Sequence, residues 1–451
     1  MRFAVWAALL LVVRSVFAAT QITDIDSVIR EAGEDIQRGH FQPAGALLRH
    51  AVSRYPSELR LWNFLGIVET ELHHPREAQS AFERGLQIDP RSIELNENFG
   101  LFYFKQASYL SARKYLARAV RLGSNKPGVA FSLAAARLRT GEHAQALSDF
   151  KRLEPALSQV ADYWKERGLA ETDFDLAAAA SCFDRSLSLD PRDPGALNGA
   201  ATVAERQHLD EKALAYLIRA KTIAPDDIRT LTHFGQICLR RDLASDALES
   251  LERAHRLAPS DNAALYLAAR ANIALEQWQR SYDLFSEFTR REPQFAPAFY
   301  ALAWLDIKLS RLDRARSELQ HCLSLSPNYL DPRYQLAELD LDDGRINTAQ
   351  QLLSAVLTRD PHHVRANIAL ADLLMRTGKL SGAETYLKQA IADDPRNGPA
   401  HYKLSVVYLR LRQPELGRKE GEIAAALNTE AKRASRTQLR IDIPDSEAPS
   451  E

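Results

Sequence analysis

Four tyrosines recur at a constant spacing along the chain, with one step of twice that length, and they are the side chains best suited to recognition chemistry. They are Tyr266, Tyr300, Tyr334 and Tyr402. A phenol ring offers a large apolar surface with a hydrogen-bonding tip, and a neighbouring arginine can hold carboxylates or stack on rings. Such a strip suits an extended peptide or a glycan. Alternatively, the rings fill space between adjacent helices and expose only their hydroxyls; the sequence leaves both interpretations open.

Catalytic motifs are missing from the sequence. It has no Gly-x-x-x-x-Gly-Lys loop, His-Glu-x-x-His helix, Cys-x-x-Cys pair or Gly-x-Ser-x-Gly elbow. The pairs His73-His74 and His362-His363 are adjacent residues without a spaced third ligand, so neither predicts a metal site. We therefore expect a protein that is not an enzyme and that needs no cofactor.

Proline recurs with the same period as the tyrosines, and this period predicts the architecture that positions them. A strict repeat with the step from Pro191 to Pro225 is typical of a tandem array of two-helix units. Because proline has a fixed φ and no N–H, it closes the second helix of each unit. The prolines in phase are Pro56, Pro90, Pro191, Pro225, Pro259, Pro293, Pro327, Pro361 and Pro395.

Small and large apolar residues repeat in the same phase. Some three turns before the proline stands a small residue, such as Ala78 or Ala247, which lets two helix backbones approach closely. A larger residue such as Phe82 follows one turn later on the same face. The first helix carries a large residue followed by a small one, as in Leu65-Gly66. Together these positions predict the core stripe of a helical hairpin.

This pattern resembles the tetratricopeptide repeat (TPR) family, whose signature is a periodic series of Trp, Leu-Gly, Tyr, Ala, Phe, Ala and Pro. The resemblance implies an all-α fold: a right-handed α-solenoid of about twelve helix-turn-helix units over residues 25–427. One residue is missing from the phase between Ser124 and Pro191, so we expect a seam near residues 155–168. The unit that matches most fully has Trp62, Leu65, Gly66, Ala78, Phe82 and Pro90. By phase, the units start near Ile25, Leu59, Ile93, Pro127, Val160, Pro194, Ile228, Asn262, Ala296, Leu330, Val364 and Gly398.

The resemblance also implies which residues face a ligand. In this family the first helices line a concave groove, and positions two, five, nine, twelve and thirteen of each unit commonly point into it. We therefore expect a binding surface that includes the tyrosines at position five. The candidate ligand-binding residues are Gln236, Arg240, Tyr266, Arg270, Tyr300, Trp304, Tyr334 and Glu338.

The three cysteines are expected to be buried and unbridged. Cys182, Cys238 and Cys322 lie in separate units, with another unit between each pair. Packed helices are about 8–10 Å apart, whereas a disulfide needs Cα atoms within about 7 Å. An intermolecular bridge is the alternative.

The two ends of the chain differ from the repeats. A basic start, the apolar run Phe3 to Val13 and the small residues around Ala18 predict a cleaved signal peptide, residues 1–18. The apolar run is too short to span a bilayer, so a retained anchor is the weaker alternative and no stable membrane insertion is expected after cleavage. Residues 19–24 are a short lead, and residues 428–451 are expected to be a helix end and a disordered tail.

Charge and composition complete the functional hypothesis. The chain has 58 Lys and Arg against 59 Asp and Glu, without a basic stripe, so nucleic acid is not an expected partner. We expect an exported, non-catalytic scaffold, periplasmic or extracellular, that binds extended peptide segments or components of envelope or secretion machinery in its groove. The alternative is a non-catalytic subunit of a polysaccharide synthesis, modification or export complex, which would have a glycan ligand.

Overall fold

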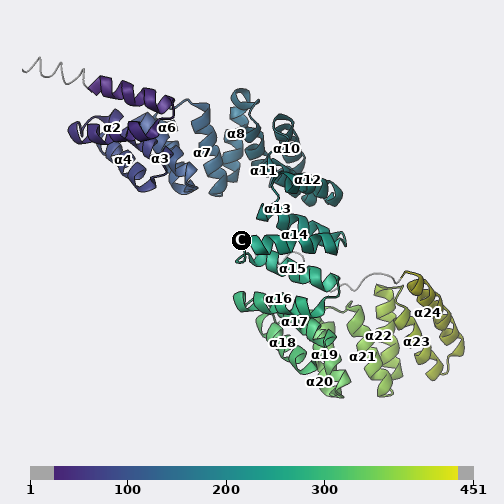
Figure 1. Cartoon of the computed structure of the whole chain (residues 1–451). Coiled ribbons are helices and arrows are strands. Elements are labelled where there is room, and N and C mark those ends of the chain that lie inside the picture. The colour runs from purple at the N-terminus through teal and green to yellow at the C-terminus, as the bar shows by residue number, and fades with distance from the viewer. Residues whose placement is uncertain (1–24, 435–451) are drawn as a thin grey trace, which may run out of the picture. The chain divides into compact units, whose positions relative to one another are not determined.

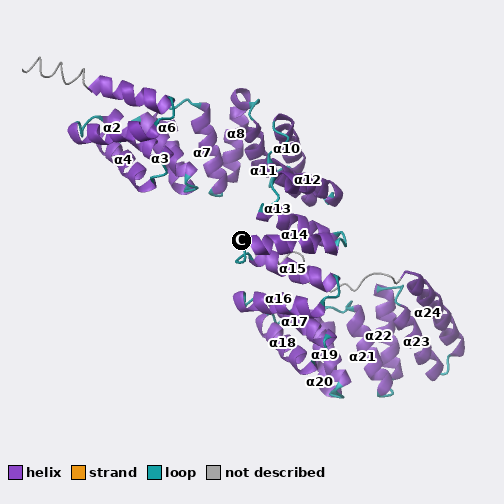
Figure 2. Ribbon diagram, in the orientation of Figure 1, coloured by secondary structure: helices purple, strands orange, loops and turns teal. Residues whose placement is uncertain are grey.

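The computed structural model describes residues 25–434. Within this range every element is a helix, and short turns join successive helices (Figures 1 and 2). The predicted signal peptide, the lead and residues 435–451 of the predicted tail lie outside the described residues. The last helix continues past the predicted boundary at residue 427 and ends at Ala434.

The described helices form twelve consecutive pairs, one pair for each repeat. The first helices are residues 25–37, α3 (Leu59–Glu71), α5 (Ile93–Lys105), α7 (Pro127–Arg139), α9 (Ala161–Glu171), α11 (Pro194–Arg206), α13 (Ile228–Arg240), α15 (Asn262–Ala274), α17 (Ala296–Lys308), α19 (Leu330–Asp342), α21 (Val364–Arg376) and α23 (Gly398–Arg410). The second helices are α2 (Phe41–Arg54), α4 (Pro75–Ile88), α6 (Tyr109–Leu122), α8 (His143–Leu157), α10 (Leu176–Leu189), α12 (Asp210–Ile223), α14 (Ala244–Leu257), α16 (Trp278–Arg291), α18 (Leu312–Leu325), α20 (Ile346–Arg359), α22 (Leu380–Asp393) and α24 (Pro414–Ala434). The predicted all-α solenoid of helix pairs is confirmed.

The chain divides into two compact parts, residues 1–216 and 217–451, called here the N-terminal and C-terminal parts. In each part, a second helix packs against its own first helix and against the first helix of the next repeat, as α4 does with α3 and α5, and α14 with α13 and α15. First helices of neighbouring repeats also touch, as α3 and α5 do, and α13 and α15. Within each part the core is therefore a row of small clusters along the repeats, with the first helices in a continuous row on one side.

Close packing explains why a small residue follows a large one in the first helix. A Cβ atom on Gly66 would lie 2.5 Å from the ring of Phe82, and one on Gly100 would lie 2.6 Å from Leu116. Phe82 and Leu116 are the large residues of the second helices and are fully buried or nearly so. Glycine therefore fits where the large side chain lies directly against the backbone of the facing helix.

The turn inside nearly every repeat places one residue in the left-handed region. Glycine occupies this position in four of the turns, with φ of 73° at Gly344. In other repeats a residue other than glycine adopts the same positive φ, although this conformation is strained for L-residues. Those residues are His73, Ala107, His208, Asp242, Glu276, Ser310 and Arg412.

The fifth repeat carries the seam. The first residues of α8 and α10, His143 and Leu176, are one position closer together than the repeat period requires. The α9 helix has 11 residues where α7 and α11 have 13. The missing residue thus lies between Ala161 and Leu176, in α9 and its turn, a range that overlaps the predicted segment over residues 161–168. The turn after α9, residues 172–175, lacks the left-handed residue; Asp175 closes it by accepting hydrogen bonds from the N–H groups that begin α10.

The three cysteines are buried and make no disulfide, as expected. Burial raises the pKa of the Cys182 thiol to about 11 and the pKa values of Cys238 and Cys322 to about 12. These thiols therefore act as small apolar residues of the core. Among the described helices, none is both long and apolar enough to cross a membrane.

Candidate functional site

A groove of about 410 Å³ lies on the row of first helices in the C-terminal part. Its walls are formed mainly by α19 and α21, with α17 and α23 at its ends. It carries three cationic and three anionic side chains, and apolar residues such as Ile368 and Leu339 lie between them. We call it the α19–α21 groove. Its charged residues are Glu338, Asp342, Arg365, Asp372, Arg376 and Lys403.

Tyr334 is fixed on one wall of this groove. Its hydroxyl donates a hydrogen bond to Glu338 one turn along α19, and the guanidinium of Arg365 lies 5.0 Å from its ring centroid. Arg365 also pairs with Asp331 at 2.6 Å. The nearby His363, with Arg365, lowers the pKa of the Asp331 carboxyl below its usual range, so that carboxyl remains charged at neutral pH. Burial raises the pKa of the Tyr334 phenol and keeps it neutral.

Asp372 organises the opposite wall. Its carboxylate pairs with Lys403 from α23 at 2.7 Å and with Arg376 at 3.3 Å. About 30% of the Asp372 side chain remains exposed, and more than half of Arg376 is exposed. These exposed ion pairs are weak and can exchange partners with an incoming ligand. The wall therefore presents both a donor and an acceptor to solvent.

The tyrosines at position five pack between repeats. Tyr266 lies 5.4 Å from Phe295, Tyr300 the same distance from Tyr329, and Tyr334 the same distance from His363, measured between ring centroids. Each partner stands immediately before the first helix of the next repeat. The exposed fractions are 0% for Tyr266, 4% for Tyr300 and 5% for Tyr334.

Of the two interpretations that the sequence left open for the ladder, the burial of these rings favours packing between repeats. Tyr266 and Tyr300 fill space between adjacent repeats, which was the alternative interpretation of the pattern. Tyr402 is 63% exposed, and no further helix pair follows its repeat among the described residues. The face of the first helix is the one expected, but the following repeat covers the ring.

The other candidate residues lie along the same row of helices. Trp304 is half-buried, and its ring lies edge-on to that of Trp278 with 5.4 Å between the ring centroids. The Lys308 ammonium lies 4.9 Å from the centroid of the Trp304 ring. Gln236, Arg240 and Arg270 are half-buried on α13 and α15. Of the eight candidates, only Tyr334 and Glu338 come together in the α19–α21 groove.

Several groove residues were not among the sequence candidates, although the same positional rule could have found them. In the repeat that starts at Val364, positions two, five, nine and thirteen are occupied by residues that all line the groove. Lys403 follows Tyr402 and occupies position six, which the rule omits. The residues at those four positions are Arg365, Ile368, Asp372 and Arg376.

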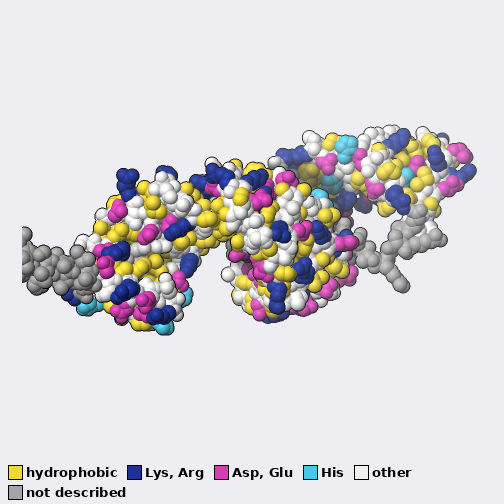
Figure 3. Space-filling model, turned by 90° about the horizontal axis from the view of Figure 1, so that it is seen from above, with side chains coloured by type: hydrophobic (Ala, Val, Ile, Leu, Met, Phe, Trp, Pro, Cys, Tyr) yellow, Lys and Arg dark blue, Asp and Glu magenta, His cyan; other side chains and the backbone are white. Residues whose placement is uncertain are grey.

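The histidine pairs have structural roles in the described chain. His363 caps the N-terminus of α21 and accepts a hydrogen bond from the N–H of Ala366 at 3.1 Å, while His362 pairs with Asp393 at 2.7 Å. Between residues 25 and 434 no group of three or more histidine, cysteine or acidic side chains is arranged to hold a metal ion. On the face drawn in Figure 3, basic and acidic side chains are interspersed with apolar ones.

Sequence comparison places this fold in a family. Two tetratricopeptide repeat models match the chain, one over residues 306–357 and 340–404 and the other over residues 175–228. The helix pairs, the repeat period and the close contacts between small and large residues continue through the rest of the described chain. The chain is a tetratricopeptide repeat protein. This family is generally a non-catalytic fold for protein–protein interaction.

Solved structures give matches of similar architecture at low identity. The TPR protein YrrB, described as having an unusual peptide-binding site, is 18% identical, with 41% of this chain and 95% of that chain covered and a TM-score of 0.36. The APC/C hetero-tetramer Cut9–Hcn1 is 11% identical, with 90% of this chain and 95% of that chain covered and a TM-score of 0.48. A tetratricopeptide repeat protein from Parabacteroides merdae is 17% identical, with 53% of this chain and 96% of that chain covered and a TM-score of 0.45. None of the curated proteins matches this chain.

Proposed function

We propose that the chain is an exported, non-catalytic scaffold that binds an extended peptide segment of a partner protein in the α19–α21 groove. The observation that carries the proposal is the balanced set of charges along three consecutive first helices, α19, α21 and α23, with apolar residues between them. A peptide backbone offers both hydrogen-bond donors and acceptors, and it needs both from its receptor. The groove volume of about 410 Å³ lies within the range of ligand sites.

The groove is partly preorganised for such a ligand. Tyr334, Arg365 and Asp331 hold one another on one wall, so that little side-chain entropy is lost there on binding. Arg376 and Asp342 on the rim are exposed and can pair with ligand charges of either sign. Export rests on the leader-like residues 1–18, and a periplasmic or extracellular location follows from that part of the proposal.

Selection from a displayed random peptide library tests the proposed site. Peptides selected on the wild-type chain should bind at least about tenfold more weakly to the Arg376→Glu and Ile368→Glu variants, because these changes reverse a rim charge and remove an apolar contact. Arg290→Glu is the matched control: Arg290 is exposed on a second helix of the same part and does not line the groove. Selected peptides that bind all three variants equally would place the site elsewhere.

A further inference from the structure

A second cavity, of about 640 Å³, lies in the N-terminal part, where α6, α7 and α8 line it. We call it the α6–α8 pocket. Five of its lining side chains are cationic, two are acidic and five are apolar, so the pocket has three more positive than negative groups. The cationic residues are Arg113, Lys114, Arg121, Arg137 and Arg152, and the acidic residues are Glu142 and Asp149.

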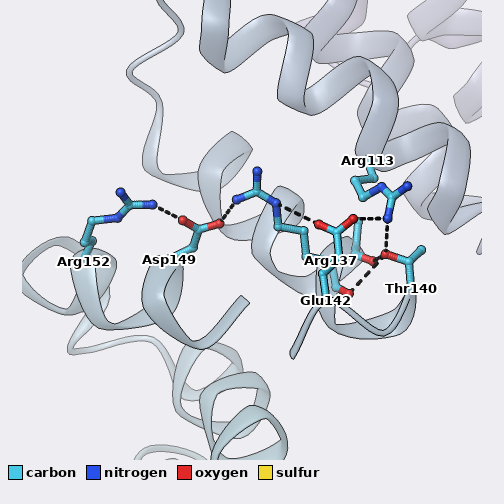
Figure 4. Close-up of polar contacts among 7 residues, drawn as sticks. Arg113, Arg137, Thr140, Glu142, Asp149 and Arg152 are labelled. Atoms are coloured by element: carbon cyan, nitrogen blue, oxygen red, sulfur yellow. Dashed lines mark hydrogen bonds and ion pairs between the residues drawn. The ribbon is translucent and has the colours of Figure 1, made fainter. Parts of the chain in front are cut away.

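The two carboxylates alternate with three of the guanidinium groups in a row of contacts (Figure 4). Arg152 and Arg137 both donate to Asp149, and Arg137 and Arg113 both pair with Glu142. Asp149 is nearly buried and Arg137 is partly buried, so the middle of the row is held in place, whereas Arg152 extends into solvent at one end. Both ends of the row are cationic, and the row keeps one positive charge.

The arginines at the two ends of the row keep donors for a ligand. Arg113 donates to Glu142 and Thr140 through Nη1, and Arg152 donates to Asp149 through Nη2. Their other N–H groups make no hydrogen bond to a described residue. A guanidinium presents its N–H groups in a fork that matches the two oxygens of a carboxylate. Each end of the row can therefore bind one carboxylate of a ligand.

Two further cations of the pocket stand on α6. Lys114 and Arg121 are exposed, and neither pairs with an acidic side chain of the described chain. The α6 helix itself has no Asp or Glu. These two side chains therefore attract an acidic ligand to the pocket without competition from a neighbouring carboxylate on their own helix.

Apolar side chains lie among these charges. Val120 is exposed next to Arg121, and Leu133 and Leu153 also line the pocket. A ligand side chain that covers Val120 would remove apolar surface of both from water. A phosphate backbone would gain nothing from such a contact, and the two carboxylates of the pocket would repel it. The chemistry therefore favours a ligand that carries both carboxylates and an aliphatic side chain.

We propose that the α6–α8 pocket binds an acidic segment of a partner protein, in which aspartates or glutamates flank a leucine or a similar side chain. The carboxylates meet the cationic ends of the row and the two α6 cations, while the aliphatic side chain lies on Val120. Charge complementarity selects this occupant, whereas the α19–α21 groove has three groups of each sign and gives no such preference. The pocket shares no residue with that groove, and its proposed ligand does not depend on the groove.

Fluorescence anisotropy with a rhodamine-labelled peptide, Asp-Glu-Leu-Asp-Asp-Leu, tests this assignment on the full chain. Replacing every acid by its amide, or both leucines by serine, should weaken binding at least about tenfold, because each change removes one half of the recognition. No binding of the parent peptide, or equal binding of either derivative, would overturn the proposal. Displacement of the peptide by an equally charged single-stranded oligonucleotide would also overturn it, because the pocket would then be a general anion site.

Reversal of the two exposed cations tests whether the pocket is the site. Lys114→Glu with Arg121→Glu should bind the acidic peptide about tenfold more weakly, and should bind Lys-Lys-Leu-Lys-Lys-Leu more tightly than the wild-type chain does. Loss of folding could not produce that gain. Arg256→Glu with Arg290→Glu is the matched control: it changes the net charge equally, at exposed positions of α14 and α16 outside the pocket, and should alter neither affinity. Equal effects of the two double variants would contradict the proposal.

Photo-crosslinking locates the bound peptide. With benzoylphenylalanine in place of the first leucine of the probe, crosslinks are expected on α6, α7 or α8, near Val120 or Leu133, and mass spectrometry identifies them. Crosslinks confined to α19 or α21 would place the acidic peptide in the α19–α21 groove. That result would refute the assignment to the pocket and would leave the proposal for the groove intact.

Discussion

The α6–α8 pocket and the α19–α21 groove show how one repeat makes two kinds of surface. Both are built from helix pairs of the same repeat phase. The pocket uses second helices and has five cationic groups against two carboxylates, whereas the groove uses first helices and has three of each. The repeat constrains the positions that pack, and the charges at the remaining positions vary from one repeat to the next. Architecture and ligand preference are therefore separate properties of this chain.

The two sites also differ in how their charges are held. In the pocket, Asp149 is nearly buried beneath two arginines, while Asp372 in the groove keeps about 30% of its side chain exposed. Buried ion pairs are geometrically strict, and exposed pairs rearrange at little cost. The pocket is thus suited to one charge pattern and the groove to several.

The largest expected effect comes from removing the central acid of each site. Asp149→Ala leaves the partly buried Arg137 with Glu142, at 3.5 Å, as its remaining carboxylate partner, and should lower the free energy of unfolding by about 3 kcal/mol, the low end for a broken buried pair. Asp372→Ala removes an exposed pair and should cost about 1 kcal/mol or less. Urea denaturation followed by circular dichroism measures both. Equal costs would show that the two networks do not differ in the way described.

A second contrast concerns the small residue that faces the large one. Gly66 in the N-terminal part and Ala337 in the C-terminal part occupy the same repeat position. A Cβ on Gly66 meets the Phe82 ring, so Gly66→Ala should destabilise by about 1–3 kcal/mol. Ala337→Gly only loosens a helix and should cost about 0.5–1 kcal/mol. Thermal melts of both variants give the comparison, and a harmless Gly66→Ala would contradict the packing described.

Much of the fold could be predicted from the sequence because the signal is local and repeated. Proline phase gives the first residue of nearly every first helix, and α9 differs by only one residue, Ala161 instead of Val160. Glycine in four turns marks the left-handed residue, but Ala107 and Glu276 adopt the same conformation without that signal. The spacing predicted that one residue is missing from the fifth repeat. It could not place the loss in α9, because spacing does not say which element is shorter.

The candidate site was less predictable. Repeat phase gives the face on which Tyr266 and Tyr334 lie, but it does not say what covers them. Coverage depends on the residue that precedes the next first helix, Phe295 for Tyr266 and His363 for Tyr334. The α6–α8 pocket follows from charges at positions that do not repeat, which no periodic pattern reveals.

Buried acids without hydrogen bonds should behave opposite to Asp149. Asp306 is fully buried, and its nearest cation, Arg311, is 3.6 Å away; burial raises the pKa of its carboxyl. Asn272 holds the same position in the preceding repeat and donates to Ala268 O at 2.8 Å, so an amide fits there. Asp306→Asn should therefore stabilise the protein at pH 7, by about 1 kcal/mol.

The pH dependence of this gain has a definite sign. Since the folded carboxyl binds its proton more tightly than the unfolded one, whose pKa is about 3.9, wild-type stability falls as pH rises through and above that value. The advantage of Asp306→Asn should thus be present at pH 7 and disappear near pH 3. Denaturation at both values tests it, with the paired Asp340→Asn, expected to destabilise, as the control. A gain of equal size at both values would show that the buried charge is not its origin.

The smallest effect separates backbone strain from packing in the two parts. Ala107 and Gly344 occupy the same turn position, with φ of 54° and 73°, and nothing lies within 4 Å of where a Gly344 Cβ would stand. Gly344→Ala should therefore cost about 1 kcal/mol through conformation alone, and Ala107→Gly should gain up to about 0.5–1 kcal/mol. Gly128→Ala, in the first turn of α7 with equally open surroundings, serves as the control and should be neutral or stabilising. If the two turn substitutions changed stability in the same direction, the turns of the two parts would differ in more than the residue that they carry.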